Sequence, residues 1–121
     1  MKGITVLGST GSIGVNTLDV ISRHADKYKI KALTANTNDD LIREQCIKHQ
    51  PEFAVMVDED SALRLEQKLK DQAPDVTVLS GVDGLLRVAT LVDVDYVMAA
   101  IVGAAGLLPT LDAAKAGKRV L

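Results

Sequence analysis

The feature that most constrains this chain is a short β-prone run that passes directly into evenly spaced glycines, within residues 4–18 (ITVLGSTGSIGVNTL). Gly8, Gly11 and Gly14 recur every third residue, and an amphipathic helical pattern begins among them. Gly8 permits the turn out of the strand, Gly11 lets a ligand approach the backbone closely, and Gly14 lets the helix pack against the strand. The stretch therefore predicts a strand, a tight turn and a helix whose N-terminus can hold an anion.

Hydroxyl side chains surround this turn, at Ser9, Thr10 and Ser12. They add hydrogen-bond donors beside a helix N-terminus, whose free N–H groups and positive dipole end attract phosphate. The GxxGxxG spacing is one residue longer than the common GxGxxG fingerprint, yet it stands directly after the first strand, as a dinucleotide site requires. The alternative is a glycine-rich turn that serves packing alone.

Composition is typical of one globular domain and narrows the class of partner. The 121 residues suffice for one core, which Val, Ile, Leu and Ala must build because the chain has no Trp and only two Tyr and one Phe. A net charge of −2 without a basic patch argues against nucleic acid. No targeting segment and no apolar run of roughly 18 residues is present, so we expect no membrane partner. The single cysteine, Cys46, cannot form an internal disulfide, which favours the cytoplasm.

Alternating strand and helix patterns predict an α/β fold, a Rossmann-like doubly wound parallel sheet in three α/β/α layers. Five main strands are expected in the spatial order 3-2-1-4-5, numbered along the chain, and a short additional strand at 76–79 is not counted among them. Ligands in such a sheet bind at the switch point beside strand one. The strands are predicted at 4–7, 28–35, 53–57, 94–100 and 119–121, and helices at 12–24, 39–49, 59–72, through 85–89 and after 106.

Two helices carry predicted apolar faces, and that of the first helix is expected to pack on the sheet. The first helix presents Ile13, Thr17, Leu18 and Ile21 at helical spacing. The last helix presents an apolar stripe made of Leu107, Leu108, Leu111 and Ala114. It is closed by Gly117 in the C′ position.

The chain stops within the last predicted strand, so we expect an N-terminal fragment of a longer enzyme.

The turn after the second strand is where a dinucleotide fold meets the adenosine ribose. An NAD site usually places an acidic residue there, about 20 residues beyond the glycines. Asn36 is neutral, which favours NADP, although Asp39 and Asp40 follow soon after. Asn38 could equally serve as an N-cap, with the two aspartates complementing the dipole of the next helix. Both interpretations can hold together.

Other chemistry-bearing residues give no catalytic or metal pattern. Cys46 lies on the inner side of its predicted helix and is expected in the core. His24 and His49 fall near helix C-termini without partners at ligand spacing. The sixteen Asp and Glu residues are scattered, and none forms a convincing metal or acid–base pair.

Two stretches, Leu7–Val20 (LGSTGSIGVNTLDV) and Met98–Leu111 (MAAIVGAAGLLPTL), closely resemble the N-terminal domain of the 1-deoxy-D-xylulose 5-phosphate reductoisomerase family. That family converts a phosphosugar substrate to 2-C-methyl-D-erythritol 4-phosphate in non-mevalonate isoprenoid biosynthesis. The resemblance implies a rearrangement, then hydride transfer from NADPH, with Mg or Mn as divalent metal. It also implies a homodimer for the full-length protein. Alternatives are the cofactor domain of another GxxGxxG reductase, such as a semialdehyde dehydrogenase, and a stand-alone nucleotide-binding regulatory module.

The resemblance assigns cofactor-binding roles residue by residue. It implies phosphate contacts at residues 10–13, a cofactor contact at Asn38, and a strand end that runs alongside the cofactor at residues 100–102. The family pattern has Gly then Lys where this chain has Asn36 then Thr37. The expected cofactor-binding set is Gly8, Thr10, Gly11, Ser12, Ile13, Asn36, Thr37, Asn38, Ala100 and Ile101. The family's Lys-Asn-Glu segment and metal ligands would lie beyond Leu121, so we expect this chain to be inactive by itself.

Overall fold

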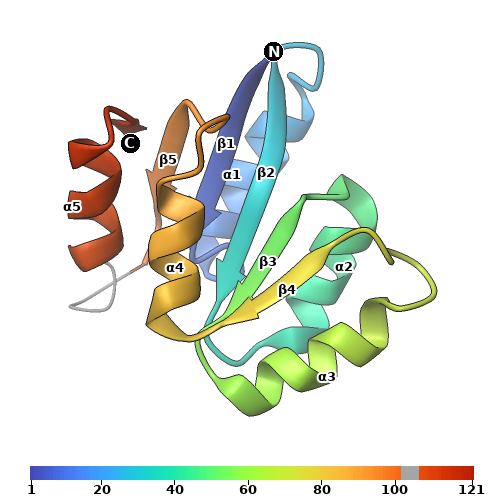
Figure 1. Cartoon of the computed structure of the whole chain (residues 1–121). Helices are drawn as coiled ribbons and strands as arrows, with labels where there is room; N and C mark the ends of the chain where they lie inside the picture. The colour runs from blue at the N-terminus through green and yellow to red at the C-terminus, as the bar shows by residue number, and fades with distance from the viewer. Residues whose placement is uncertain (102–106) are drawn as a thin grey trace.

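The computed structural model describes residues 1–101 and 107–121, which form a six-stranded parallel sheet flanked by helices (Figure 1). The strands are β1 (Lys2–Leu7), β2 (Tyr28–Ala35), β3 (Phe53–Met56), β4 (Thr77–Ser80), β5 (Tyr96–Ala99) and β6 (Arg119–Val120). The helices are α1 (Ser12–Ser22), α2 (Asp39–His49), α3 (Glu59–Leu69), α4 (Gly81–Ala89) and α5 (Leu107–Lys115). The predicted elements are confirmed, although α1 and α3 end two or three residues earlier than expected.

The strand order is β4-β3-β2-β1-β5-β6, with every pairing parallel. The chain winds outward from β1 to β4 and then crosses back to place β5 on the other side of β1. The predicted order is therefore confirmed, and the short strand predicted at 76–79 is β4 at the outer edge. Residues of α1, α2 and α3 share the core on one face, and residues of α4 and α5 share the core on the other, as right-handed crossovers predict. The switch point lies between β1 and β5.

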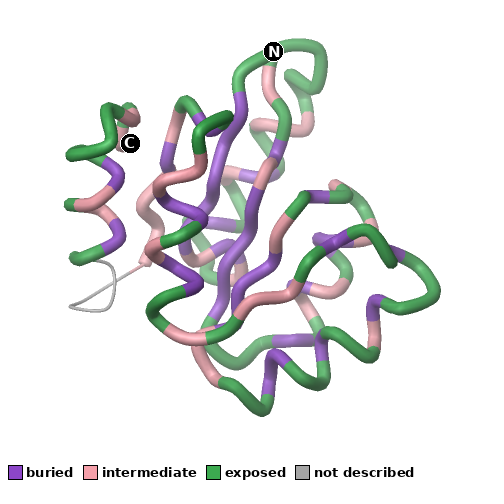
Figure 2. Tube along the Cα trace, viewed as in Figure 1, coloured by how far each residue is buried: buried purple, intermediate pink, exposed green. Residues whose placement is uncertain are grey.

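Each face of the sheet has its own hydrophobic core. Val6 packs with residues of α1, α2 and α3, whereas its neighbour Leu7 packs with residues of α4 and α5. Both side chains are 0% exposed, as expected for a central parallel strand whose successive side chains point to opposite faces. Figure 2 shows buried positions running along the middle strands. This arrangement confirms the three α/β/α layers.

The prediction that the face of α1 from Ile13 to Ile21 packs on the sheet is wrong for its first turn. Leu18 is buried, but the Ile13 side chain is 57% exposed. Ile13 instead lines an open groove, whose opposite side includes Met98 and Leu121. The first turn of α1 therefore faces apolar residues across this groove without being buried against them.

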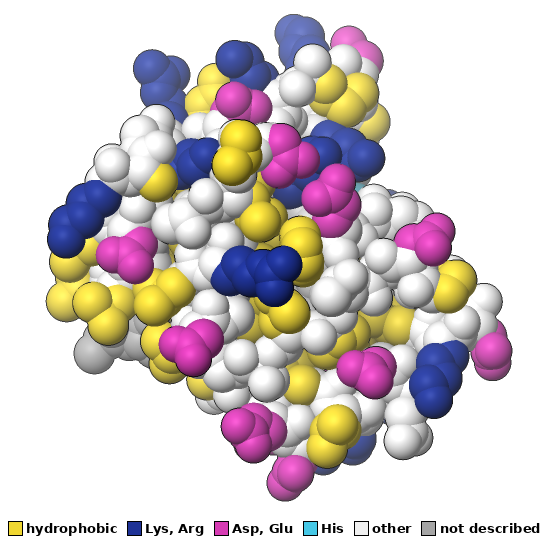
Figure 3. Space-filling model, viewed as in Figure 1, with side chains coloured by type: hydrophobic (Ala, Val, Ile, Leu, Met, Phe, Trp, Pro, Cys, Tyr) yellow, Lys and Arg dark blue, Asp and Glu magenta, His cyan; other side chains and the backbone are white. Residues whose placement is uncertain are grey.

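The apolar stripe predicted for α5 lies largely on the surface. Leu107, Leu108 and Leu111 are 46–59% exposed, and hydrophobic side chains gather over α5 on the molecular surface (Figure 3). The buried residues are instead Pro109 and Ala113, whose small side chains let α5 lie close to its neighbours. The predicted ending is confirmed, because Gly117 follows the helix with a φ of +82°.

Candidate functional site

A crevice of about 410 Å³ opens at the carboxyl ends of the strands, at the switch point between β1 and β5. Six predicted site residues line it together: Gly8, Thr10, Gly11, Asn36, Ala100 and Ile101. Thr34, Ala35, Val57 and Leu85 complete the lining and were missed by the sequence analysis. The first three could have been found as residues at the carboxyl ends of β2 and β3. Leu85 carries no such signal, because its position depends on how α4 crosses the sheet.

Gly8 makes the turn that carries the chain from β1 toward α1. Its φ is +79°, a conformation that L side chains rarely adopt, and an added Cβ would lie 3.0 Å from Ala100 O. The Gly8 N–H donates to Thr34 Oγ1 at 2.8 Å, and the Ala100 N–H donates to Leu7 O at 2.9 Å. The predicted turn is confirmed, with β2 on one side of it and the end of β5 on the other.

Gly11 and Gly14 differ in the space around them. An ideal Cβ on Gly14 would lie 2.1 Å from Gly8 O and 2.7 Å from Ser9 Cα, so α1 packs directly against the turn. A Cβ on Gly11 would meet only Gly8 O, at 3.8 Å, and its φ of −77° is ordinary. Gly14 therefore has the predicted packing role, while Gly11 leaves open space at the helix N-terminus.

The N-terminus of α1 is available to an anion. Gly11 is its N-cap, and within the described residues no side chain caps it and no acidic residue lies in its first turn. The dipole and the free N–H groups of such an end favour phosphate. Ser12 is exposed there. Ile13 lines a different groove, described below, so a contact of Ile13 with phosphate in the crevice would have to use its backbone N–H.

Of the two functions that the sequence left open for the turn after β2, the structure confirms the N-cap. Asn36 lines the crevice, whereas Thr37 and Asn38 lie just beyond its lining. The Leu41 N–H donates to Asn38 Oδ1 at 3.2 Å, which confirms the N-cap. Cofactor contacts by Thr37 and Asn38 remain predictions.

The two aspartates that follow this turn do not face the crevice. Asp39 is 7% exposed and its carboxylate is paired with Lys68 at 2.6 Å and with Arg64 at 3.5 Å. The hydrogen bond from the Lys68 ammonium lowers the pKa of Asp39, which keeps this carboxylate ionised and paired. Lys68 also pairs with Asp40 at 2.5 Å. Their charge is thus directed toward α3 and compensated there, so it gives no argument against a 2′-phosphate near Asn36.

Nucleophilic and metal chemistry find little support in the described residues. Cys46 is 0% exposed in the core, and burial raises the pKa of its thiol to about 12. Across residues 1–101 and 107–121, no three His, Cys, Asp or Glu side chains lie together in a way that could hold a metal ion. Among the same residues, no helix is long and apolar enough to cross a membrane.

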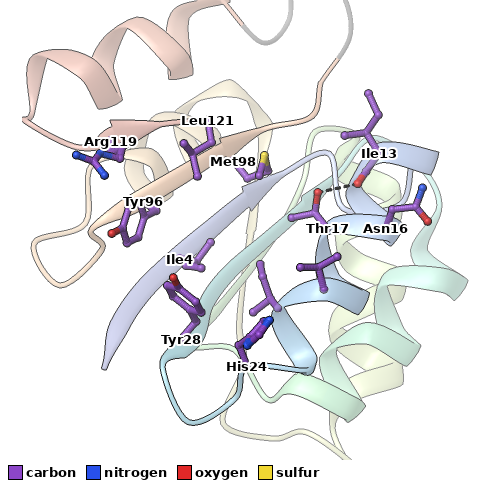
Figure 4. Close-up of a pocket in the computed structure, with 12 residues that line it drawn as sticks. Ile4, Ile13, Asn16, Thr17, His24, Tyr28, Tyr96, Met98, Arg119 and Leu121 are labelled. Carbon is purple, nitrogen blue, oxygen red and sulfur yellow. Dashed lines mark hydrogen bonds between the residues drawn. The ribbon is translucent and has the colours of Figure 1, made fainter.

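A larger cavity, of about 590 Å³, is the groove between α1 and strands β1, β5 and β6, here called the α1 groove (Figure 4). Its lining is mostly apolar, and Tyr28 and Tyr96 meet in it edge to face at a centroid distance of 6.1 Å. Ile13, predicted to contact cofactor, lines this groove with its side chain. The groove shares no lining residue with the crevice. Because the glycine turn and the free helix end belong to the crevice, the crevice is the candidate site.

The predicted site segment at residues 100–102 is only partly described by the structure. Ala100 and Ile101 line the crevice as predicted. Val102, which the resemblance places alongside the cofactor, lies outside the described residues.

Comparison with known proteins gives a consistent family. The family model described as 1-deoxy-D-xylulose 5-phosphate reductoisomerase matches residues 4–121. The reductoisomerase of Cellvibrio japonicus is 60% identical over 120 residues, covering 99% of this chain and 30% of that protein. The reductoisomerase of Nitrosococcus oceani is 53% identical over 121 residues, covering 100% of this chain and 31% of that protein. The chain thus spans about 30% of the length of these relatives.

Solved structures agree with this result. The 1-deoxy-D-xylulose 5-phosphate reductoisomerase from Zymomonas mobilis in complex with NADPH is 39% identical, with a TM-score of 0.91 over 98% of this chain and 31% of that one. A DOX-P reductoisomerase in complex with NADPH, fosmidomycin and magnesium is 42% identical, with a TM-score of 0.94 over 99% of this chain and 29% of that one. The matches favour the reductoisomerase over the other GxxGxxG reductases that the sequence left open. This chain belongs to the 1-deoxy-D-xylulose 5-phosphate reductoisomerase family.

Proposed function

We propose that this chain is the NADPH-binding domain of a 1-deoxy-D-xylulose 5-phosphate reductoisomerase, with residues 1–121 forming one domain. The observation that carries the proposal is the crevice at the switch point, where Gly8, Thr10 and Gly11 meet Asn36 and the end of β5 beside the free N-terminus of α1. Similar proteins of 39–42% identity were solved with NADPH.

The residues of the crevice fit three parts of a dinucleotide. The N-terminus of α1 and the open space at Gly11 would take the pyrophosphate, because free N–H groups and the helix dipole favour anions. The turn from Asn36 to Asn38 would take the 2′-phosphate. Ala100 and Ile101 would lie beside the nicotinamide half. The bound cofactor supplies the hydride, while this chain binds and orients it.

The reaction itself belongs, in this proposal, to the longer family protein. That protein would rearrange and reduce a phosphosugar, 1-deoxy-D-xylulose 5-phosphate, and its homodimeric state and cytoplasmic location remain predictions. Magnesium is present in related structures, but the described residues of this chain offer no cluster to hold it. We therefore assign no metal-dependent step to this chain and expect no reductoisomerase activity from it alone.

The direct test is a calorimetric titration of this chain with NADPH and, in parallel, with NADH. Saturable binding of NADPH at one site, tighter than that of NADH, is the expected result. Gly11→Ala should weaken NADPH binding by roughly 10- to 100-fold, because a methyl group enters the space meant for phosphate. The control is Ala25→Ser, on the exposed loop after α1, which should bind NADPH as tightly as the parent chain. Gly81→Ala would not serve, because Gly81 has a φ of +75° and alanine would strain the backbone there. Equal binding of NADH would contradict the NADP assignment.

Thr37→Lys should raise the preference for NADPH over NADH by about tenfold, because an ammonium makes a charge-assisted hydrogen bond to phosphate that a hydroxyl cannot match. Thr37 follows Asn36 directly and is free of the Asp39 pairing with Lys68. Thr37→Met is the matched control, since it adds length without charge and should leave the ratio of the two dissociation constants unchanged. An unchanged ratio in Thr37→Lys would place the 2′-phosphate elsewhere.

A further inference from the structure

A buried polar link lies behind the glycine turn at residues 8–11 and joins it to α2. Ser9 in the turn and Gln45 on α2 are 36 residues apart in sequence, and they are 0% and 8% exposed. Both the oxygen and the nitrogen of the Gln45 side-chain amide form hydrogen bonds with Ser9. Its Oε1 accepts from Ser9 Oγ at 2.7 Å, and its Nε2 donates to Ser9 O at 2.9 Å.

This link fixes more than the Ser9 side chain. The described peptide bonds are all trans, and in a trans peptide the carbonyl of one residue and the N–H of the next point in opposite directions. Holding the Ser9 carbonyl therefore also sets the direction of the Thr10 N–H. Thr10 lines the crevice, whereas Gln45 does not. Gln45 thus acts on the crevice from outside it.

The turn is held from β2 as well. The Gly8 N–H donates to Thr34 Oγ1 and the Ser9 N–H donates to Thr34 O, both at 2.8 Å. Within the described residues, every buried side-chain nitrogen and oxygen has a hydrogen-bond partner. A buried network that is fully satisfied is rigid, and rigidity in the free protein lowers the ordering cost of binding.

We infer that Gln45 is a positioning residue for the cofactor: acting through Ser9, it keeps the peptide between Ser9 and Thr10 aimed for phosphate binding without touching the ligand. The inference rests on the proposed function, because the ligand that the turn receives is the dinucleotide of that proposal. It assigns to α2 a role in cofactor affinity, beyond its packing on the sheet.

Gln45→Met is the main test, since methionine has a similar length but leaves the Ser9 carbonyl without its donor. In this chain the dissociation constant for NADPH should rise about tenfold, with the stoichiometry still one. Gln67→Met is the matched control, because Gln67 lies exposed on a neighbouring helix of the same face, and its dissociation constant should stay unchanged. Ser9→Ala keeps the carbonyl link and should raise the dissociation constant only about threefold.

A purely structural role for Gln45 would reduce the number of binding-competent molecules and leave the dissociation constant unchanged, which would overturn the inference. A second readout needs no ligand: in NMR spectra of the free chain, the amide signals of Thr10 and Gly11 should be sharp in the parent and in Gln67→Met, and exchange-broadened in Gln45→Met. If these signals broaden in Gln45→Met but the parent chain does not bind NADPH, the proposed function is refuted and the positioning role of Gln45 stands. Unchanged signals in a folded Gln45→Met would refute the positioning role, whether or not the parent binds NADPH.

Discussion

Gly14→Ala is expected to destabilise the chain by at least about 3 kcal/mol, at the upper end of what overpacking costs. The added Cβ would lie 2.1 Å from Gly8 O and 2.7 Å from Ser9 Cα, and both are backbone atoms of the turn that cannot rotate away. Glycine to alanine inside a helix normally stabilises by about 1 kcal/mol, so the expected sign is the reverse of helix propensity. Urea denaturation followed by circular dichroism measures this loss, and NADPH binding should be lost with it because α1 must move off the turn.

Gly11→Ala is the control for this substitution, since it adds the same methyl group three residues earlier. Its Cβ would meet only one atom, at 3.8 Å, and its φ suits alanine. Its stability should fall by no more than about 1 kcal/mol, the cost of a poorer N-cap. Equal urea midpoints for the parent and Gly14→Ala would contradict the close packing of α1 on the turn.

Leu65→Ala is expected to cost about 2–5 kcal/mol of the free energy of unfolding. Leu65 lies on the inner face of α3, is 0% exposed, and packs in the core shared with α1 and α2. Removing its side chain leaves a cavity under the sheet that its neighbours fill only in part. Against a total of roughly 5–15 kcal/mol for a small domain, such a loss shifts the urea midpoint far to lower concentration.

Leu63→Ala provides the comparison on the same helix. Leu63 stands two residues earlier and is 63% exposed, so its replacement should change the free energy of unfolding by about 0.5 kcal/mol or less. A similar loss in both variants would mean that α3 presents a different face to the sheet.

Local signals predicted most of what surrounds the crevice. The glycine spacing alone indicated the turn at Gly8, the packing role of Gly14 and the open position at Gly11, because each depends on backbone geometry within one βα unit. Asn38 as N-cap followed from its place before an acidic first turn. The strand order followed from the alternation of elements and the handedness of crossovers.

The errors arose where a partner far along the chain decides the outcome. Hydrophobic periodicity identified Ile13 and Leu108 as apolar, but it cannot tell how closely other segments pack on them, and both residues are more than half exposed. The hydrogen bonds between Gln45 and Ser9 were not predicted, because they form only when α2 docks beside the turn. The cofactor contacts of all ten predicted site residues remain predictions.

The placement of β5 beside β1 has a consequence for the order of folding. Between these neighbours the chain passes through β2, β3 and β4, so one wall of the crevice, at Ala100 and Ile101, comes about 90 residues after the glycine turn. Parallel pairings between such distant segments form slowly, because the entropy cost of closing a large loop must be met before the contacts between the strands can form. During synthesis the glycine turn would therefore leave the ribosome long before Ala100 and Ile101, which form the opposite wall of the crevice. We expect the crevice to close only when the return crossing through α4 has docked, so affinity for the cofactor appears together with the complete sheet and not with its first βα unit.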